Sequence, residues 1–230
     1  VYYTSNSRNG QVGVRSLDTL PTLCYDPGVS HTQGERVTAR TAMLATEEWR
    51  SRYERIGMIA RWQPVHLGHA PVLRALCDLA EHALVGLGSS NRHNARHPFT
   101  VEETADMIDL VLAGRDNYTL IPVPDLDDGP RWRLMVLDLL EPLDLFVTAN
   151  PYVASLMRED YALVRPVELV PVEERVPVDG TLVRREMARG DGWRALVPPA
   201  VADYLGARGL DERFRREFGL ETLAMDLIVE

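Results

Sequence analysis

The sequence contains no lysine, and all 25 of its basic residues are arginines. This absence excludes Schiff-base catalysis and the lysine of a Walker A loop, because both depend on a lysine amine. Any anion that the protein binds must therefore be held by arginine, histidine, backbone N–H groups or a metal ion.

Cysteine is also scarce, with only Cys24 and Cys77 in 230 residues. Two cysteines make neither a disulfide scaffold nor a cysteine-rich zinc site. No apolar run approaches the roughly 20 residues that a membrane span requires. The first residues lack the basic and apolar segments of a secretory signal. We therefore expect a cytoplasmic protein that does not bind membranes.

Acidic residues outnumber basic ones by 34 to 25, which gives a net charge of −9. This balance argues against nucleic-acid binding, because that function usually needs a basic face. Hydrophobic residues make up 45% of the chain and charged residues 26%, as in ordinary globular proteins. The length suits one α/β domain with a small appendage.

The chain divides into three predicted regions. Residues 1–55 show scattered glycine, proline and polar residues without a sustained period, which predicts an irregular extension ending in a short polar helix at 46–55. Residues 56–212 alternate short apolar strands with amphipathic helices. This alternation predicts a Rossmann-like α/β fold, a parallel sheet with helices on both faces. Residues 213–230 are predicted to form a helical tail.

Element boundaries follow from periodicity, prolines and caps. Thr100 and Glu103 form a capping-box pattern, and Pro151 suits the first turn of a helix. The predicted strands are 57–60, 83–87, 118–123, 143–148 and 163–166, and the predicted helices are 68–82, 101–112, 131–140, 151–159, 181–189 and 199–207. A parallel sheet binds its ligands beyond the carboxyl ends of its strands.

The sharpest motif, ARWQPVHLGH at residues 60–69, lies between the first strand and the first helix. His66 and His69 are three residues apart and so share one face of the first helical turn. Backbone N–H groups and the helix dipole favour phosphate there, and Gly68 allows the backbone to approach a ligand closely. We interpret the pair as a phosphate site. A metal site would need a third ligand that the sequence does not supply, so no resident metal is expected.

Several segments in order resemble the archaeal-type nicotinamide-mononucleotide adenylyltransferases of the HxGH nucleotidyltransferase superfamily. The resemblance covers about residues 56–212. The segments that carry it are RWQPVHLGH at 61–69, GSS at 88–90, RHPFT at 96–100, IPVPD at 121–125, ANP at 149–151, GTLVRREM at 180–187 and GWRALVP at 192–198.

The resemblance implies adenylyl transfer from ATP, accompanied by Mg²⁺, to nicotinamide mononucleotide, giving NAD and pyrophosphate. It also implies homo-oligomers, which are frequent in the family. It assigns catalytic phosphate contacts to Arg61, His66, His69 and Arg184, ATP binding to Gly68, Arg96, Asn150, Gly180 and Thr181, and mononucleotide binding to Asp125 and Trp132. The Trp132 ring would stack on nicotinamide. Read alone, Trp132 fits a core residue equally well, and Asp125 fits a cap of the following loop.

The chain departs from the family's usual residues at four positions: Ala60 for glycine, Thr104 for arginine, Gly129 for asparagine and Asp179 for serine. Two alternatives stay open. The acceptor could be another phosphate ester, such as a flavin or pantetheine phosphate. The chain could also be an inactive nucleotide-binding paralogue, which Thr104 and Asp179 would favour. His93 and His97 lie in a polar loop and are expected to be exposed.

Overall fold

The computed structural model describes residues 53–227, with side chains as far as Met225. Most of the predicted extension therefore lies outside the described residues. Its last three residues belong to strand β1 (Tyr53–Ala60), not to a helix, so the strand begins earlier than predicted. The N–H groups of Glu54 and Arg55 donate to the Asp144 carboxylate at 2.7 and 2.9 Å. A local pattern cannot reveal a partner some 90 residues away.

Five parallel strands form the sheet in the order β3-β2-β1-β4-β5. The bounds of the remaining strands are β2 (Ala80–Gly88), β3 (Tyr118–Val123), β4 (Leu145–Val147) and β5 (Leu163–Val164). Strand order reverses where the chain passes from β3 to β4, so β1 and β4 flank the topological switch point. The predicted parallel α/β fold is confirmed, and its switch point is where such sheets bind ligands.

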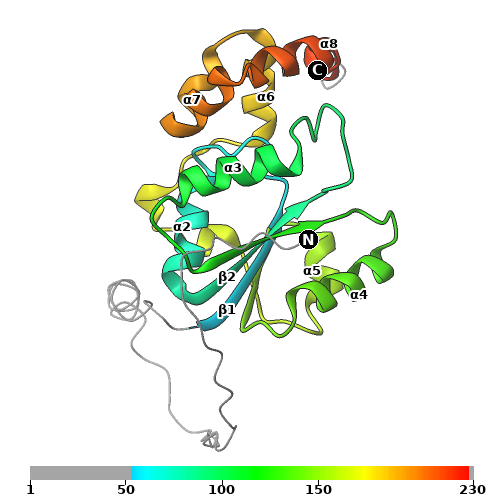
Figure 1. Ribbon diagram of the computed structural model, residues 1–230. Coiled ribbons are helices and arrows are strands. Elements are labelled where there is room, and N and C mark those ends of the chain that lie inside the picture. Colours follow the sequence, from blue (N-terminus) through cyan, green and yellow to red (C-terminus); the bar gives the residue numbers. More distant parts are fainter. Residues whose placement is uncertain (1–52, 228–230) are drawn as a thin grey trace, which may run out of the picture. The chain divides into compact units, whose positions relative to one another are not determined.

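Helices cover both faces of the sheet, as Figure 1 shows. Helices α2 (His69–Leu79) and α3 (Val101–Val111) lie on one face, and α4 (Gly129–Leu140) and α5 (Pro151–Met157) lie on the other. On the first face Leu73, Leu76, Met107 and Ile108 are fully buried. The core on the second face consists of Leu84, Ile121, Val123, Val136, Leu140, Phe146, Met157 and Tyr161.

Several helix starts agree with the sequence patterns. The Thr100 hydroxyl accepts from the N–H of Glu103 at 3.2 Å, and the Glu103 carboxylate accepts from the N–H of Thr100 at 2.9 Å. This reciprocal pair is the predicted capping box. Pro151 occupies the first turn of α5, which is also confirmed.

The C-terminal part continues through η1 (Pro166–Glu168), η2 (Val172–Glu174), α6 (Gly180–Arg189), η3 (Gly192–Leu196), α7 (Pro199–Ala207) and α8 (Leu210–Leu227). The predicted boundary between domain and tail, at residue 212, falls inside the continuous helix α8. Leu210 and Phe214 at the start of α8 are buried. The first turns of this helix are therefore part of the domain's core.

Arg213 joins α8 to the loop before α3. Its guanidinium donates to both oxygens of Glu103 at 2.6 Å and to the carbonyl of Pro98 at 3.1 Å. Burial raises the pKa of Glu103, but the Arg213 guanidinium, the N–H of Thr100 and the charge of Arg208 together hold that pKa below its usual value. A charge-assisted bidentate pair of this kind fixes both geometry and position. The C-terminal helix thus anchors the segment that contains Arg96 and His97.

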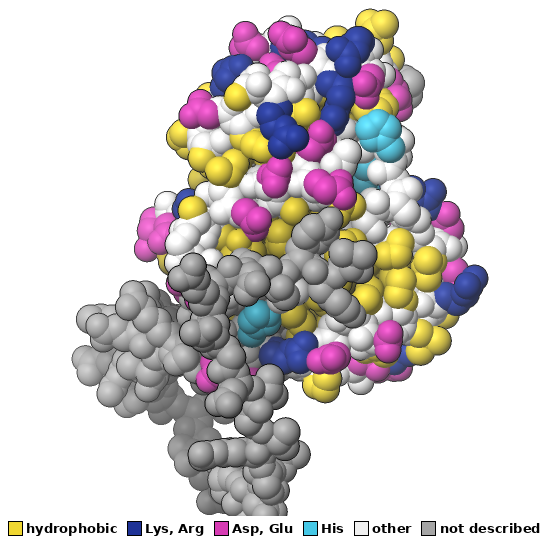
Figure 2. All heavy atoms as spheres, viewed as in Figure 1, with side chains coloured by type: hydrophobic (Ala, Val, Ile, Leu, Met, Phe, Trp, Pro, Cys, Tyr) yellow, Lys and Arg dark blue, Asp and Glu magenta, His cyan; other side chains and the backbone are white. Residues whose placement is uncertain are grey.

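Figure 2 shows arginine and acidic side chains interspersed over the part of the surface formed by α6, α7 and α8. Each sign of charge is therefore partly balanced by near neighbours on that face. Among the helices of residues 53–227, none combines the length and the apolar character that crossing a bilayer demands.

Candidate active site

A cavity of about 940 Å³ lies at the carboxyl ends of strands β1 to β4, beside the switch point. Arg61, Ser89 and Thr148, each placed just after a strand, form part of its wall. Residues separated by more than 120 positions in the sequence thus meet at one place. Of the eleven predicted site residues, the wall includes Arg61, His66, His69, Arg96, Asp125, Trp132, Asn150, Gly180, Thr181 and Arg184.

Gly68 is the predicted residue that the cavity wall lacks. A Cβ atom at this position would lie 2.6 Å from the carbonyl oxygen of Val178, which is backbone and cannot easily move. The structure thus shows a close approach between two segments of the protein at Gly68, and its contact with ATP stays a prediction. Gly68 lets the start of α2 pack against the segment that leads into α6.

The two motif histidines lie in contact. The rings of His66 and His69 are stacked, with centroids 3.5 Å apart. The buried Trp62 ring meets His69 edge-on at 4.8 Å. The Nδ1 atom of His66 accepts the N–H of Gly68 at 3.1 Å. This bond leaves Nε2–H as the donor of the neutral His66 ring.

Burial keeps both imidazoles neutral at pH 7. It lowers the pKa of His66 to about 4, despite the opposing effect of the Asp179 carboxylate. Burial and the neighbouring His66 also place the pKa of His69 well below its usual value. Both rings can therefore donate hydrogen bonds at neutral pH without carrying a charge, and a bound polyanion would favour their protonated forms.

The free energy of unfolding of the unliganded protein is expected to fall as the pH drops from 6.5 towards 4. Above pH 6.5, His66 is neutral in both the folded and the unfolded chain. Between pH 6.5 and about 4, the unfolded imidazole binds a proton that the folded one does not. A pKa difference of this size costs roughly 3 kcal/mol in full. Denaturant unfolding at pH 7, 6 and 5 measures the effect, and equal pH slopes for the wild type and His66→Gln would contradict it.

Arg184 on α6 is the buried cation of the cavity. It is only 8% exposed, and its Nη1 donates to the carbonyl of Gln63 at 2.7 Å. Burial and the charge of Arg61 lower the pKa of Arg184 to about 10, so the guanidinium remains charged at pH 7. A Cβ atom at Gly180 would lie 2.9 Å from Nη1 of Arg184. The glycine therefore leaves room for the guanidinium to reach Gln63.

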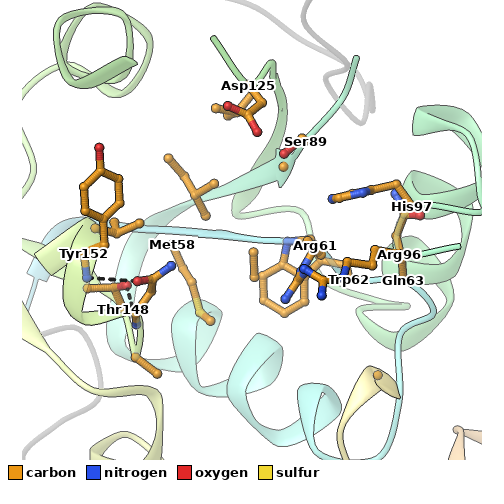
Figure 3. A pocket seen from close by; sticks show the side chains of 18 of the residues that line it. Met58, Arg61, Trp62, Gln63, Ser89, Arg96, His97, Asp125, Thr148 and Tyr152 are labelled. Carbon is orange, nitrogen blue, oxygen red and sulfur yellow. Dashed lines mark hydrogen bonds between the residues drawn. The ribbon is translucent and has the colours of Figure 1, made fainter. Parts of the chain in front are cut away.

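Two exposed arginines complete the positive end of the cavity. Figure 3 shows Arg61 and Arg96 at the end of the cavity where Gln63 and His97 also lie. Both arginines lower the pKa of Arg184, which places their charges close to it. Two guanidiniums that disfavour the charge of a third create with it a region of high positive potential. A bound polyphosphate would relieve this repulsion.

His97 differs from the expectation of an exposed loop residue. It is 9% exposed and lines the cavity, whereas the side chain of His93 remains 56% exposed. The reason is a tight turn in which the N–H of His97 donates to the carbonyl of Asn94 at 2.8 Å. Burial and then Arg61 lower the pKa of His97 to about 4. The His97 imidazole thus lies with the guanidiniums of Arg61, Arg96 and Arg184 at the positive end of the cavity.

Two of the departures from the family pattern have local structural roles. The Asp179 carboxylate caps α6 by accepting the N–H of Leu182 at 2.8 Å, a task that serine oxygens also perform. The Thr104 side chain is buried, and its hydroxyl donates to the carbonyl of Thr100 at 2.8 Å. Thr104 is not among the residues that line the cavity, whereas Asp179 lines it and its charge acts on both His66 and Arg184.

Acidic residues gather at another part of the wall. The Asp125 carboxylate accepts the N–H of Asp127 at 3.0 Å, and Arg92 pairs with both carboxylates. Asp125 therefore both caps the following loop and lines the cavity. Trp132 is half-buried, packs against the core beneath α4 and also reaches the cavity wall. The structure is thus compatible with Asp125 as a loop cap and as a cavity residue. It is likewise compatible with Trp132 as a core residue and as a cavity residue.

Residues that the sequence reading did not select also shape the cavity. Gln63 is buried, and its Oε1 accepts the N–H of Phe99 at 3.1 Å while its carbonyl accepts from Arg184. It therefore joins three of the segments that carry the resemblance. The side-chain oxygen of Asn150 accepts the N–H of Tyr152 at 2.9 Å, which caps α5. Tyr152 itself lines the cavity and was also missed.

Within residues 53–227, no group of three or more histidine, cysteine, aspartate or glutamate side chains is arranged to hold a metal ion. The cavity carboxylates of Asp125 and Asp127 are paired with Arg92, and that of Asp179 serves as a helix cap. A metal ion at this site would therefore take most of its ligands from a bound substrate.

The model of the cytidylyltransferase-like family matches residues 57–186, which is more than half of the chain. The chain belongs to the cytidylyltransferase-like family. The matched range begins inside β1 and ends in α6, so it contains strands β2 to β5 and the three arginines that form the positive end of the cavity. For this family member, the resemblance found in the sequence is confirmed.

Two archaeal relatives are nicotinamide-nucleotide adenylyltransferases. The protein of Methanolobus tindarius is 35% identical over 150 residues, which is 64% of this chain and 84% of the relative. The protein of Pyrococcus furiosus is 32% identical over 154 residues, which is 64% of this chain and 80% of the relative.

A solved bifunctional NMN adenylyltransferase/ADP ribose pyrophosphatase from Francisella tularensis superposes with a TM-score of 0.60 at 18% identity. The superposition covers 76% of this family member but only 55% of that longer chain. At this level of identity, the likeness establishes the shared fold.

Proposed function

We propose that the protein transfers the adenylyl group of ATP to nicotinamide mononucleotide, giving NAD and pyrophosphate. The observation that carries the proposal is the convergence of Arg61, Arg96 and Arg184 with the stacked histidine pair at the switch point of the sheet. Archaeal relatives of more than 30% identity bear the name of this activity. A triphosphate is the ligand that this charge distribution suits.

The reaction would need no protein nucleophile. A phosphate oxygen of nicotinamide mononucleotide attacks the α-phosphorus of ATP, and the bond from that phosphorus to the β-phosphate bridge oxygen breaks as pyrophosphate leaves. Arg184 and the Nε2–H of His66 would donate to the phosphate oxygens as negative charge moves towards the leaving group. Because the imidazoles and guanidiniums are held before the substrate binds, little reorganisation is required during the step.

A divalent cation, Mg²⁺ in our proposal, would enter bound to the phosphate oxygens of ATP. Oxygen ligands from phosphates suit this hard cation, and the Asp179 carboxylate is a candidate protein ligand, because it lines the cavity and its charge acts on both His66 and Arg184. The cation would offset charge on the leaving pyrophosphate. We also propose a cytoplasmic protein that forms homo-oligomers, which light scattering of the purified chain tests.

An acceptor panel tests the function directly. The protein is incubated with ATP, Mg²⁺ and one acceptor at a time: nicotinamide mononucleotide, nicotinate mononucleotide, flavin mononucleotide or phosphopantetheine. We expect mass spectrometry to detect NAD and an equal amount of pyrophosphate with nicotinamide mononucleotide. A dinucleotide formed only from the flavin or pantetheine phosphate would replace this proposal with the first alternative. ATP binding without pyrophosphate release for every acceptor would favour an inactive paralogue.

A further inference from the structure

Tyr152 is an aromatic residue whose exposure the fold does not explain. It lies in the first turn of α5, is 59% exposed and lines the cavity. Figure 3 shows its ring rising beside Thr148, at the opposite end of the cavity from Arg61 and Arg96. An exposed phenol that faces a cavity offers both an apolar ring and a hydrogen-bond donor.

The Tyr152 hydroxyl occupies the space of a missing side chain. A Cβ atom built at Gly129 would lie 2.1 Å from the hydroxyl oxygen and 3.1 Å from the ring carbon that bears it. Any side chain at position 129 would therefore collide with the phenol in its present position. This is also the position at which the chain departs from the asparagine of the resembling family.

Trp132 lies on the same helix as Gly129 and lines the same cavity as Tyr152. Positions 129 and 132 are three residues apart at the start of α4, so they share one face of that helix. Both Gly129 and Trp132 line the cavity. The phenol of Tyr152 and the indole of Trp132 thus border the same corner, where an aromatic ring of the acceptor would stack.

The charge at this corner favours an uncharged substituent on that ring. Asp128 directly precedes Gly129, Asp125 and Asp127 line the same cavity, and Arg92 is the guanidinium that pairs with these last two. The surplus of carboxylates would repel a carboxylate on the acceptor and would tolerate a carboxamide on a cationic pyridinium.

We propose that Tyr152 is a specificity-determining residue, whose hydroxyl donates a hydrogen bond to the carboxamide oxygen of nicotinamide mononucleotide. The contact comes from Tyr152 on α5, because Gly129 on α4 has no side chain that could make it. The inference rests on the proposed function, since it assumes that nicotinamide mononucleotide is the acceptor.

The first test compares the wild type with Tyr152→Phe, using nicotinamide mononucleotide and pyridine mononucleotide, which lacks the carboxamide. We expect the KM for nicotinamide mononucleotide to rise about tenfold, the effect of one neutral hydrogen bond. The kcat and the KM for ATP should change less than twofold. With pyridine mononucleotide, the two proteins should have the same KM, because the hydroxyl has no partner there.

The second test uses Gly129→Ala, alone and combined with Tyr152→Phe. Because the added methyl group must displace the exposed hydroxyl, Gly129→Ala should raise the KM for nicotinamide mononucleotide by a similar factor. In the Tyr152→Phe background it should add less than twofold, because the contact is already lost. Tyr204→Phe is the matched control. It removes a phenol hydroxyl that donates to Asp106 outside the cavity, so it should leave all constants unchanged.

The outcomes separate the two proposals. If the wild type makes no NAD from nicotinamide mononucleotide, the proposed function fails and this inference falls with it. If the wild type is active but Tyr152→Phe has the normal KM for nicotinamide mononucleotide, only the role of Tyr152 is overturned. The same holds if Tyr152→Phe raises the KM equally for nicotinamide mononucleotide and for pyridine mononucleotide. A wild type that uses nicotinate mononucleotide more efficiently than nicotinamide mononucleotide would contradict the preference for an uncharged substituent.

Discussion

Arg184→Met is expected to lower kcat/KM for ATP about a thousandfold, the upper range for loss of one preorganised donor to a developing charge. Methionine keeps much of the side-chain length and can be buried, but it brings neither charge nor donor. Arg184 is the least exposed of the three cavity guanidiniums, so its charge is screened least by water. Steady-state pyrophosphate release with saturating nicotinamide mononucleotide measures the loss.

Two further variants show whether the loss comes from the guanidinium itself. Arg184→Lys keeps a charge but not the planar fork that reaches the Gln63 carbonyl, so we expect only partial recovery. Arg189→Met removes an arginine from the last turn of the same helix, where its side chain is 52% exposed and outside the cavity wall. It should retain activity within about twofold. An Arg184→Met protein that remains folded and has normal kcat/KM would remove Arg184 from the mechanism.

His69→Ala is expected to lower kcat for adenylyl transfer about a hundredfold, with a smaller change in the KM for ATP. The imidazole is neutral and packed between His66 and Trp62, so it adds a fixed donor whose contribution grows with charge in the transition state. A single-turnover measurement with ATP and nicotinamide mononucleotide isolates this step from product release.

His93→Ala is the control for the histidine prediction, because that ring is exposed and pairs with Glu217 on α8. Its kcat should stay within about twofold of the wild type. A thermal unfolding curve of His69→Ala separates loss of chemistry from loss of folding, since removal of a ring from the His66 stack also leaves a space. An unchanged kcat would exclude His69 from the reaction.

Local periodicity predicted most of the fold. Residues 118–123 and 199–207 have the predicted bounds, because an apolar strand between polar turns and a helix opened by proline are both determined by nearby residues. The start of β1 could not be predicted in this way. Its first residues are polar, and they extend the strand through bonds to Asp144, which is close only in the folded chain.

For the candidate site too, residues that are neighbours in the sequence could be predicted more readily than contacts between distant ones. The His66 and His69 motif was visible because its residues are neighbours in the sequence, and the resemblance supplied the distant Arg184. The cap made by Asp179 could have been foreseen, since aspartate is a good residue before a helix. The space shared by Gly129 and Tyr152 could not, because the two positions lie on different helices.

The contact between Arg213 and the Pro98–Glu103 segment has a consequence for how the protein is made. Arg213 follows Glu103 by 110 residues, so on the ribosome the earlier segment emerges long before its partner. Until α8 has been translated, the stretch that contains Arg96 and His97 lacks the bonds from Arg213 to Pro98 and Glu103, although the capping box of α3 can already form. The nascent chain can therefore form its sheet before the positive end of the cavity gains the contacts that Arg213 makes.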